Sequence, residues 1–396
     1  MDWLIPDTPD ELAALVAERA RDADPELPLL ATGTPGPTEA ARRMAGAEDA
    51  VVLSTAGLAG EPDLRPRDLT ASVPAGLRLG DLQRTLADEG LWLAAGGPAL
   101  RRSAGGAVAA GAAGPWDLSF GDLGRQLLAC RLVTWSGTRA RWGRAVMKDV
   151  AGYGTTRAVL GSFGRLGVLH RAVFRVWPRP ETSRALELVP ADGDDLAAAA
   201  RLAGSDLDDR VRPDALRWER TAGDAAAVPI EAWLVGPEAS VAGRADRLAD
   251  VAGELGLRVQ GERRGLDLAD PAGGREERDP GAGRDAGVSV AELRPGRGEF
   301  GIVLRRAVEA MGNAAVRWTG HPLAGVLRCA WRTDDPPAAA ERLLSAAGDA
   351  PVRLLRGTAR ELAATDDRRP EAALALEERV LEALEGRPRH WLSAWL

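Results

Sequence analysis

A tract of small residues between Gly96 and Gly111 is the first candidate for binding chemistry. Its second half reads Ser103-Ala104-Gly105-Gly106-Ala107-Val108-Ala109-Ala110-Gly111. Without large side chains, the backbone N–H groups of such a tract can approach a phosphate closely, and glycine permits the positive φ angles that an anion-binding loop needs. The alternative is a tract that is only glycine- and alanine-rich within an alanine-rich chain. The tract alone leaves both interpretations open.

Two residue types that occur once in the chain stand within one short run. Lys148 is the only lysine and Tyr153 the only tyrosine, with Asp149, Val150, Ala151 and Gly152 between them. Lysine presents a compact ammonium on a flexible stem, whereas arginine presents a planar fork, so a lysine kept in an otherwise arginine-only chain is informative. The run therefore favours a functional loop over a coincidence.

Two further loops are rich in small residues. The first, at residues 32–37, reads Thr32-Gly33-Thr34-Pro35-Gly36-Pro37, and its two prolines have no N–H to donate. The second, at residues 161–169, reads Gly161-Ser162-Phe163-Gly164-Arg165-Leu166-Gly167-Val168-Leu169. The second segment predicts a tight loop that opens onto a buried strand. By itself it fits a sharp turn as well as a cofactor loop.

Several common sites are missing from the sequence. It contains no Walker A loop, and its G-x-G-x-x-A match at residues 281–286 has no strand before it, so no Rossmann site is predicted. Two cysteines, Cys130 and Cys329, are too few for an iron–sulfur cluster or a structural zinc, and they favour buried, reduced thiols. No metal site is predicted.

Composition narrows the class of protein. The 396-residue chain has a net charge of −7 and shows no basic stripe interleaved with aromatics, so nucleic acid is not an expected partner. Its N-terminus lacks the pattern of a signal peptide, and no apolar stretch approaches the roughly 20 residues of a membrane helix. We expect a cytoplasmic protein without a transmembrane segment, which would reach a membrane only through partners.

Periodicity and turn residues predict the elements that position these segments. Helices are expected at 9–21, 79–89, 239–255, 338–346 and 370–385. Strands are expected at 50–54, 68–73, 127–135, 139–142 and 173–176, and then at 186–189, 215–218, 231–235, 289–293, 315–318 and 325–331. Residues 261–287 are expected to form a loop. The second half therefore predicts an α+β domain whose antiparallel sheet is covered on one face.

The order of these motifs resembles the FAD-binding subunits of glycolate oxidase, a flavoprotein family of the vanillyl-alcohol-oxidase or PCMH type. That family carries, in order, Gly-Gly-x-x-Ala-x-Gly, a hairpin, Val-x-Lys-Asn-Val-Ala-Gly-Tyr-Asp, Gly-Ser-x-Gly-x-Leu-Gly-Val and Pro-x-Pro-Glu. The corresponding segments here are residues 105–111, 146–153, 161–168 and 178–181. Asp149 stands where the family has Asn, and Gly154 where it has Asp.

The resemblance implies an α+β fold and a flavin. It implies a PCMH-type FAD-binding domain of two α+β subdomains at 1–181, an α+β cap domain with an antiparallel sheet at 182–350, and a return segment at 351–396 that packs on the FAD domain. FAD would be non-covalent, because the first loop has no His or Cys, and backbone contacts would dominate. The implied cofactor-binding residues are Thr32, Gly33, Thr34, Gly36, Ser103, Ala104, Gly105, Gly106, Gly111, Lys148, Asp149, Val150, Ala151, Gly152, Tyr153, Gly164, Gly167 and Val168.

The segment Trp318–Val326 resembles the cap segment in which a histidine of the family precedes a Gly-Val strand near the flavin. His321 is therefore the candidate catalytic residue, which would hold a substrate carboxylate or take a proton, although a structural histidine fits equally. The implied activity is oxidation of a 2-hydroxy acid such as glycolate, with electrons passed to an iron–sulfur partner. A second flavin subunit is the other implied partner.

Two other functions stay open. Pro35 and Pro37, and a chain end that lacks the family's closing Asp-Pro-x-Gly-Ile-x-Asn-Pro-Gly motif, favour a non-catalytic scaffold subunit with weakened or lost FAD binding. The retained Lys148 and Tyr153 favour the flavoenzyme instead. A standalone oxidase that passes electrons to oxygen is the third possibility.

Overall fold

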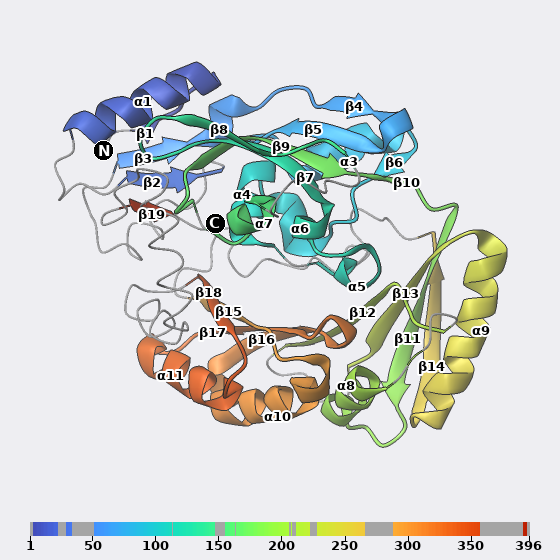
Figure 1. Cartoon of the computed structure of the whole chain (residues 1–396). Coiled ribbons are helices and arrows are strands. Elements are labelled where there is room, and N and C mark those ends of the chain that lie inside the picture. The colour runs from blue at the N-terminus through green and yellow to red at the C-terminus, as the bar shows by residue number, and fades with distance from the viewer. Residues whose placement is uncertain are drawn as a thin grey trace. The chain divides into compact units, whose positions relative to one another are not determined.

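A computed structural model of the chain describes residues 3–22, 29–33, 51–112, 114–146, 155–162, 164–205, 207, 211–221, 228–265, 288–356 and 391–393. These residues form two compact units (Figure 1). The first unit holds the described residues up to Gly114, those from Phe120 to Arg179, and the strand 391–393. The second unit holds Pro115–Ser119 and the described residues from Pro180 to 356.

The first unit contains a four-stranded parallel sheet in the order β1-β3-β2-β19. Its strands are β1 (Trp3–Leu4), β3 (Val51–Ser54), β2 (Leu29–Thr32) and β19 (Trp391–Ser393). Helix α1 (Pro9–Asp22) buries Leu12 and Val16 in a core that also contains Val51 and Leu53. Because β19 pairs with β2, the last described residues of the chain complete this sheet.

The start of α1 follows from its sequence. The Glu11 N–H donates to Thr8 Oγ1 at 3.1 Å, and the Glu11 carboxylate accepts from the Asp7 N–H at 2.9 Å. Pro9 occupies the first helical position, where its missing N–H leaves no bond unmade. Thr8 and Glu11 therefore form a capping box at the start of the helix expected at 9–21, with the return bond made to Asp7 instead of Thr8.

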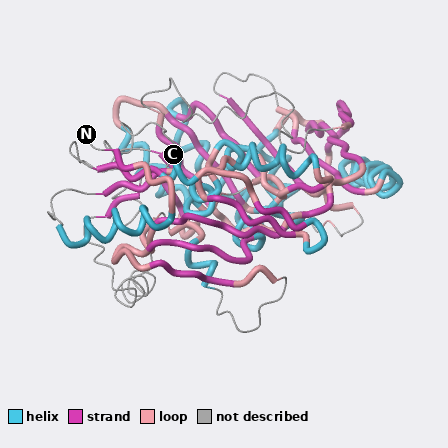
Figure 2. The backbone as a smooth tube through the Cα atoms, turned by 90° about the horizontal axis from the view of Figure 1, so that it is seen from above, coloured by secondary structure: helices cyan, strands magenta, loops and turns pink. Residues whose placement is uncertain are grey.

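A five-stranded antiparallel sheet forms the rest of the first unit, in the order β4-β5-β9-β7-β8. Its strands are β4 (Asp63–Arg65), β5 (Thr70–Pro74), β9 (Val168–Arg175), β7 (Leu127–Val133) and β8 (Arg139–Gly143). A separate pair joins β6 (Leu91–Trp92) to β10 (Trp177–Pro178). Figure 2 draws the strands as magenta tubes and the helices as cyan ones.

Helices cover one face of this sheet (Figure 1). They are α3 (Leu79–Asp88), α4 (Ala104–Ala110), α6 (Leu123–Gln126) and α7 (Thr155–Val159). Alternate strand residues such as Val73, Cys130 and Phe174 are fully buried in the core beneath them. Because side chains alternate along a strand, the residues between them point to the opposite face, which carries no helix over most of its area.

The second unit is built on an eight-stranded sheet, antiparallel throughout, in the order β14-β11-β13-β12-β16-β17-β15-β18. Its strands are β14 (Leu257–Arg264), β11 (Thr182–Pro190), β13 (Ile230–Gly236), β12 (Ala215–Thr221), β16 (Ala315–His321), β17 (Val326–Trp331), β15 (Ser289–Leu293) and β18 (Val352–Arg356). Since β18 pairs with β15, this sheet extends past residue 350, where the sequence placed the end of the cap domain.

Four helices lie on one face of this sheet (Figure 1). They are α8 (Asp195–Gly204), α9 (Glu238–Glu254), α10 (Phe300–Met311) and α11 (Pro336–Ala347). On that face Trp218 donates its indole N–H to Asp195 at 2.8 Å, and a Cβ placed on Gly320 would lie 3.2 Å from Phe300. The expected antiparallel sheet covered on one face is confirmed.

Some elements differ from the sequence prediction. Helices α5 (Asp117–Phe120), α8 and α10 were not predicted. Trp116, which directly precedes α5, packs its ring 5.5 Å from that of Trp233. The loop prediction for 261–287 was wrong for its first four residues, which continue strand β14. The predicted helix 370–385 lies outside the described residues.

Both cysteines are buried and free, as predicted. Burial raises the pKa of the Cys130 thiol to about 12, so it stays protonated. Within the described residues, no helix combines the length and apolar character needed to cross a bilayer.

Candidate functional site

The glycine-rich tract predicted as an anion-binding loop is a helix instead. Ser103 is the N-cap of α4, and its Oγ accepts the N–H of Gly106 at 3.1 Å. Of the tract's glycines only Gly111 has a positive φ, of 54°, where it ends the helix. The loop interpretation was wrong because serine followed by small residues is also the pattern of a helix N-terminus.

The N–H groups at the start of α4 already have acceptors within the protein. Those of its first three residues donate to the Leu77 carbonyl at 2.8 Å, the Ala75 carbonyl at 2.9 Å and the Ser103 hydroxyl. A Cβ on Gly105 would lie 2.9 Å from the Ala75 Cβ, so this glycine allows the helix to pack closely on the loop after β5. The expected backbone donors to a pyrophosphate are therefore engaged.

The end of β2 meets the start of α4. A Cβ placed on Gly33 would lie 2.1 Å from Ser103 Oγ and 3.4 Å from Gly106 Cα, so a larger residue here would have to displace the Ser103 side chain. The preceding residue, Thr32, is buried, and its carbonyl accepts the hydroxyl of Thr55 at 3.3 Å. Two predicted cofactor segments that are 70 residues apart in sequence are thus side by side.

The second glycine loop is fixed at the end of β7. The indole N–H of Trp135 donates to the Gly164 carbonyl at 3.0 Å, and Gly164 has a φ of 75°. Gly167 has a φ of 135°, and a Cβ there would lie 2.3 Å from the Val133 carbonyl oxygen. Val168 is buried and pairs with Val133. Glycine is required at residue 167 for both conformation and space.

The same loop is joined to α4, because the Gly161 N–H donates to the Val108 carbonyl at 3.1 Å. Segments 32–33, 103–111 and 161–168 are therefore connected around one short helix. The remaining residues implied by the resemblance lie outside the described residues; they are Thr34, Gly36, Lys148, Asp149, Val150, Ala151, Gly152 and Tyr153.

His321 is the last residue of β16, in the second unit, and its side chain is 2% exposed. Burial lowers the pKa of His321 to about 3, helped by the nearby cations Arg328 and Arg217 and opposed by the Leu216 backbone and Glu292. Within the described residues neither ring nitrogen makes a hydrogen bond of normal geometry. The imidazole is therefore neutral near pH 7, which suits hydrogen bonding to a substrate better than proton abstraction.

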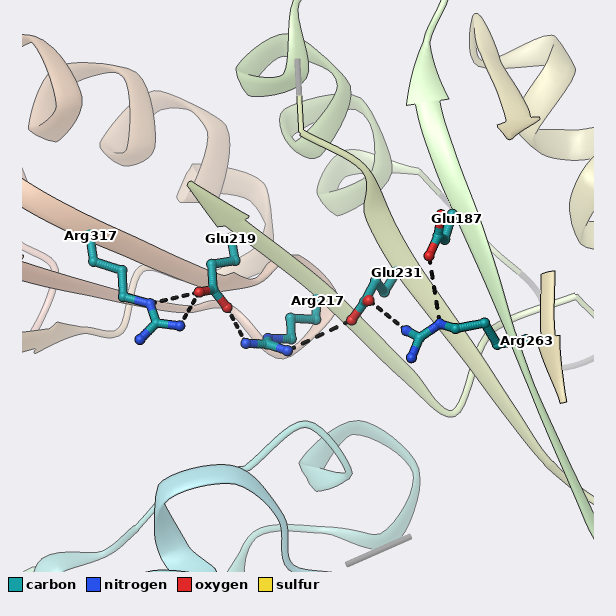
Figure 3. Close-up of polar contacts among 6 residues, drawn as sticks. All are labelled: Glu187, Arg217, Glu219, Glu231, Arg263 and Arg317. Carbon is teal, nitrogen blue, oxygen red and sulfur yellow. Dashed lines mark hydrogen bonds and ion pairs between the residues drawn. The ribbon is translucent and has the colours of Figure 1, made fainter. Parts of the chain in front are cut away.

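A ladder of alternating charges crosses the helix-free face of the second sheet (Figure 3). Its members, in order, are Arg317, Glu219, Arg217, Glu231, Arg263 and Glu187. Arg317 Nε lies 2.6 Å from Glu219 Oε1, and Arg263 Nη2 lies 2.6 Å from Glu231 Oε1. Arg217 joins the two halves, since it hydrogen-bonds Glu219 and lies 3.7 Å from Glu231.

The strand register explains the ladder. Arg217 stands directly opposite Glu231 on the neighbouring strand, and their side chains are 5% and 7% exposed. A similar group continues on β15 and β17, where Glu292 accepts from Arg328 at 2.9 Å and from Arg294 at 2.8 Å. The sequence analysis missed both groups, although glutamate and arginine at alternate strand positions was the signal available.

Comparison with known proteins addresses the first unit. A family described as FAD binding domain matches residues 3–143, which include the whole of β2 and α4. This segment is similar to an FAD-binding domain. FAD is the cofactor that this match supports. Segments 32–33 and 103–111 lie within the matched residues, and segment 161–168 begins 18 residues after them.

Two of the relatives by sequence are glycolate oxidase subunits. The chain is 37% identical over 126 residues to glycolate oxidase subunit GlcE of Escherichia coli (strain K12), a match that covers 31% of this chain and 35% of that protein. It is 30% identical over 125 residues to glycolate oxidase subunit GlcD of Bacillus subtilis (strain 168), covering 31% and 27%. The matches thus span about a third or less of each relative.

Similarity of fold extends further than similarity of sequence. A solved chitooligosaccharide oxidase aligns with a TM-score of 0.66 at 13% identity, covering 99% of this chain and 91% of that one. At this identity the comparison shows a shared α+β fold and nothing about substrate.

Proposed function

We propose that this chain is the flavin-carrying part of an oxidoreductase that oxidises a 2-hydroxy acid such as glycolate. The observation that carries the proposal is the FAD-binding domain at 3–143, inside which Gly33 and the start of α4 meet. The names of the glycolate oxidase relatives support the substrate class. When bound, FAD would supply the acceptor for the hydride removed from the substrate carbon.

The residues around α4 fit a flavin cofactor in one respect and restrict it in another. Gly33 and Gly106 have no side chain, which lets the end of β2 approach the start of α4 closely, so that both proposed cofactor segments lie at one place. The N–H groups of the first turn are already engaged, so we propose that Ser103 contributes its hydroxyl proton, for which the described residues offer no acceptor. Non-covalent binding by Thr32, Gly33, Ser103–Gly106, Gly111, Gly164, Gly167, Val168 and the segments 34–36 and 148–153 is part of this proposal.

We propose that the second unit binds the substrate, with His321 as the residue in contact. A neutral imidazole between Arg217 and Arg328 can donate a hydrogen bond to a carboxylate that the two guanidinium groups attract. We assign His321 the holding of the substrate carboxylate and not the removal of a proton, because its low pKa makes it a weak base.

We further propose that the chain works as one subunit of a complex with an iron–sulfur subunit and a second flavin subunit. Both relatives are named as subunits. The two cysteines here are buried and in different units, too few and too far apart in the fold to hold an iron–sulfur cluster, so in this proposal the cluster belongs to another subunit.

The absorbance spectrum of the purified chain tests this function. We expect a bound-flavin spectrum, or one that develops after FAD is added and the excess is removed, and its bleaching by glycolate without oxygen. A chain that takes up no FAD would contradict the proposal. Rapid peroxide formation by the chain alone would instead support the standalone oxidase.

The engaged first-turn N–H groups of α4, together with Pro35 and Pro37, favour a second candidate, a scaffold subunit that has lost FAD. Lys148→Ala separates the two functions, with Lys148→Arg as the charge-conserving control. A flavoprotein should lose FAD in the alanine variant and keep more of it in the arginine variant. A scaffold should retain no FAD in any of the three proteins.

A further inference from the structure

The face of the five-stranded sheet opposite α3, α4, α6 and α7 places arginine opposite arginine. Arg131 on β7 is directly opposite Arg171 on β9 and directly opposite Arg141 on β8. These three residues form one row across three neighbouring strands. Arg131 and Arg141 are exposed and Arg171 is half-buried, so their guanidinium groups are presented at the surface.

A β-bulge adds a histidine to the row. The pairing of β7 with β9 shifts between Arg131 and Leu132, which leaves His170 as the extra residue beside Arg171. Burial and then the charges of Arg131, Arg171 and Arg139 lower the pKa of His170 to about 4. We call Arg131, Arg139, Arg141, Arg171 and His170 the arginine face.

Few carboxylates balance this charge. Asp10 pairs with Arg139, and Asp63, which acts on Arg171, lies 3.6 Å from Arg65. Arg171 donates to the hydroxyl of Ser72 at 3.1 Å. Among the described residues, Arg131 and Arg141 make no ion pair. Like charges directly opposite each other on a sheet destabilise it. This local excess of positive charge occurs in a chain whose net charge is −7.

We propose that the arginine face is a docking surface for an acidic polypeptide, namely a carboxylate-bearing surface of a partner subunit. Guanidinium groups bind carboxylates through paired hydrogen bonds, and a row of them fixed on a sheet is preorganised for a matching row of Asp or Glu. The partner's carboxylates offset the repulsion that the isolated sheet retains. The inference does not depend on FAD.

The chemistry of the face favours protein over membrane or nucleic acid. Among the residues that the structure describes, the large apolar side chains that are exposed are Ile5, Val146, Val259 and Ile302. All four lie outside β5, β7, β8 and β9, so none is placed to insert into lipid from these strands. Trp142 of β8 stands opposite Cys130, which is buried in the core, and so points away from the face. The arginine row therefore has no interleaved aromatic on which bases would stack.

The test uses poly-L-glutamate as an acidic polypeptide probe on the full chain, with FAD added to saturation throughout. Affinity is measured for wild type, for Arg131→Gln/Arg141→Gln, and for Arg258→Gln/Arg264→Gln. The control variant removes the same two charges from β14, where Glu262 lies 2.8 Å from Arg264. We expect the first variant to lose at least tenfold in affinity and the control to lose less than threefold.

Other results would overturn the proposal. Equal losses in the two variants would show attraction to net charge alone. Tighter arginine-dependent binding to phosphatidylserine vesicles than to poly-L-glutamate would assign the face to a membrane. A second readout is the imidazole resonance of His170, whose pKa should rise on binding as the surrounding cations are neutralised, and an unchanged value would place the probe elsewhere.

Discussion

The two antiparallel sheets of this chain each present a face that is largely or wholly without helices, and the two faces accommodate arginine in opposite ways. On the second sheet every arginine of the ladder has a glutamate beside it, and Arg217 lies between two. On the first sheet Arg131 lies between two other arginines. Side-chain exposure explains the difference.

A buried arginine must find its counter-charge within the fold, whereas an exposed one can leave it to water or to a partner. The Arg217 side chain is 5% exposed, so its neighbours on adjacent strands must be acidic. Arg131 is exposed and tolerates like charges at a modest cost. The ladder is therefore interpreted as an internal structure, and the arginine face as a surface available to another molecule.

Removing the central arginine of the ladder has the largest expected effect. Arg217→Leu should reduce the free energy of unfolding by about 3–5 kcal/mol, because it leaves Glu219 and Glu231 with one partner fewer in a buried setting. Urea denaturation measures the change, and Arg258→Leu on the exposed part of β14 is the control. A loss below about 1 kcal/mol in Arg217→Leu would show that the ladder is solvated.

The pH dependence of stability tests the positive field around His321. The pKa of its imidazole is about 3 in the folded protein, against an ordinary histidine value of 6.5, so the unfolded chain binds more protons between these values. The contribution of His321 to the free energy of unfolding should be complete above pH 6.5 and should decline as the pH falls toward 3. Between pH 7 and pH 4.5 this residue should account for about 2–3 kcal/mol.

The contribution is isolated by comparing wild type with His321→Gln in urea at both pH values, since the carboxylates titrate alike in the two proteins. On acidification from pH 7 to pH 4.5, the variant should lose about 2–3 kcal/mol less free energy of unfolding than wild type does. Equal losses would mean that His321 titrates normally in the folded state.

Placing a glutamate in the arginine face, so that charges alternate as they do in the ladder, has the smallest expected effect on the free energy of unfolding, and it should stabilise the protein. Arg131→Glu places a carboxylate between Arg171 and Arg141, and it should raise the free energy of unfolding by about 0.5–1 kcal/mol. The same change should abolish binding of poly-L-glutamate. A destabilised protein would show that Arg131 has a structural partner, and the comparison between the two faces would then be wrong.

Local signals in the sequence predicted the elements that have their own start and stop residues. The Thr8–Glu11 capping box located α1, and Gly90, with a φ of 65°, ends the predicted helix α3. The tract around Gly105 was misassigned because glycine was taken as a conformational requirement, whereas its role here is close packing against Ala75. The spacing of small residues does not distinguish these two uses.

Contacts between strands that are distant in the chain could not be predicted from the sequence. Glu219 and Arg317 meet because β12 pairs with β16, and nothing local to either strand specifies that pairing. The meeting of Gly33 with Ser103 likewise depends on how the parallel sheet is placed against α4. The family resemblance anticipated that both segments belong to one cofactor site, and whether they bind FAD stays a prediction.

Titration of the chain with FAD, in which quenching of the flavin fluorescence reports binding, tests the central claim most directly. Gly33→Val should weaken FAD binding at least tenfold, because its side chain must displace Ser103, while Gly253→Ala should change nothing, since no atom lies within 4 Å of that Cβ. Tight binding by wild type with this contrast is the predicted result. Equal FAD affinity in all three proteins, or none in wild type, would contradict a flavin site at the junction of β2 and α4.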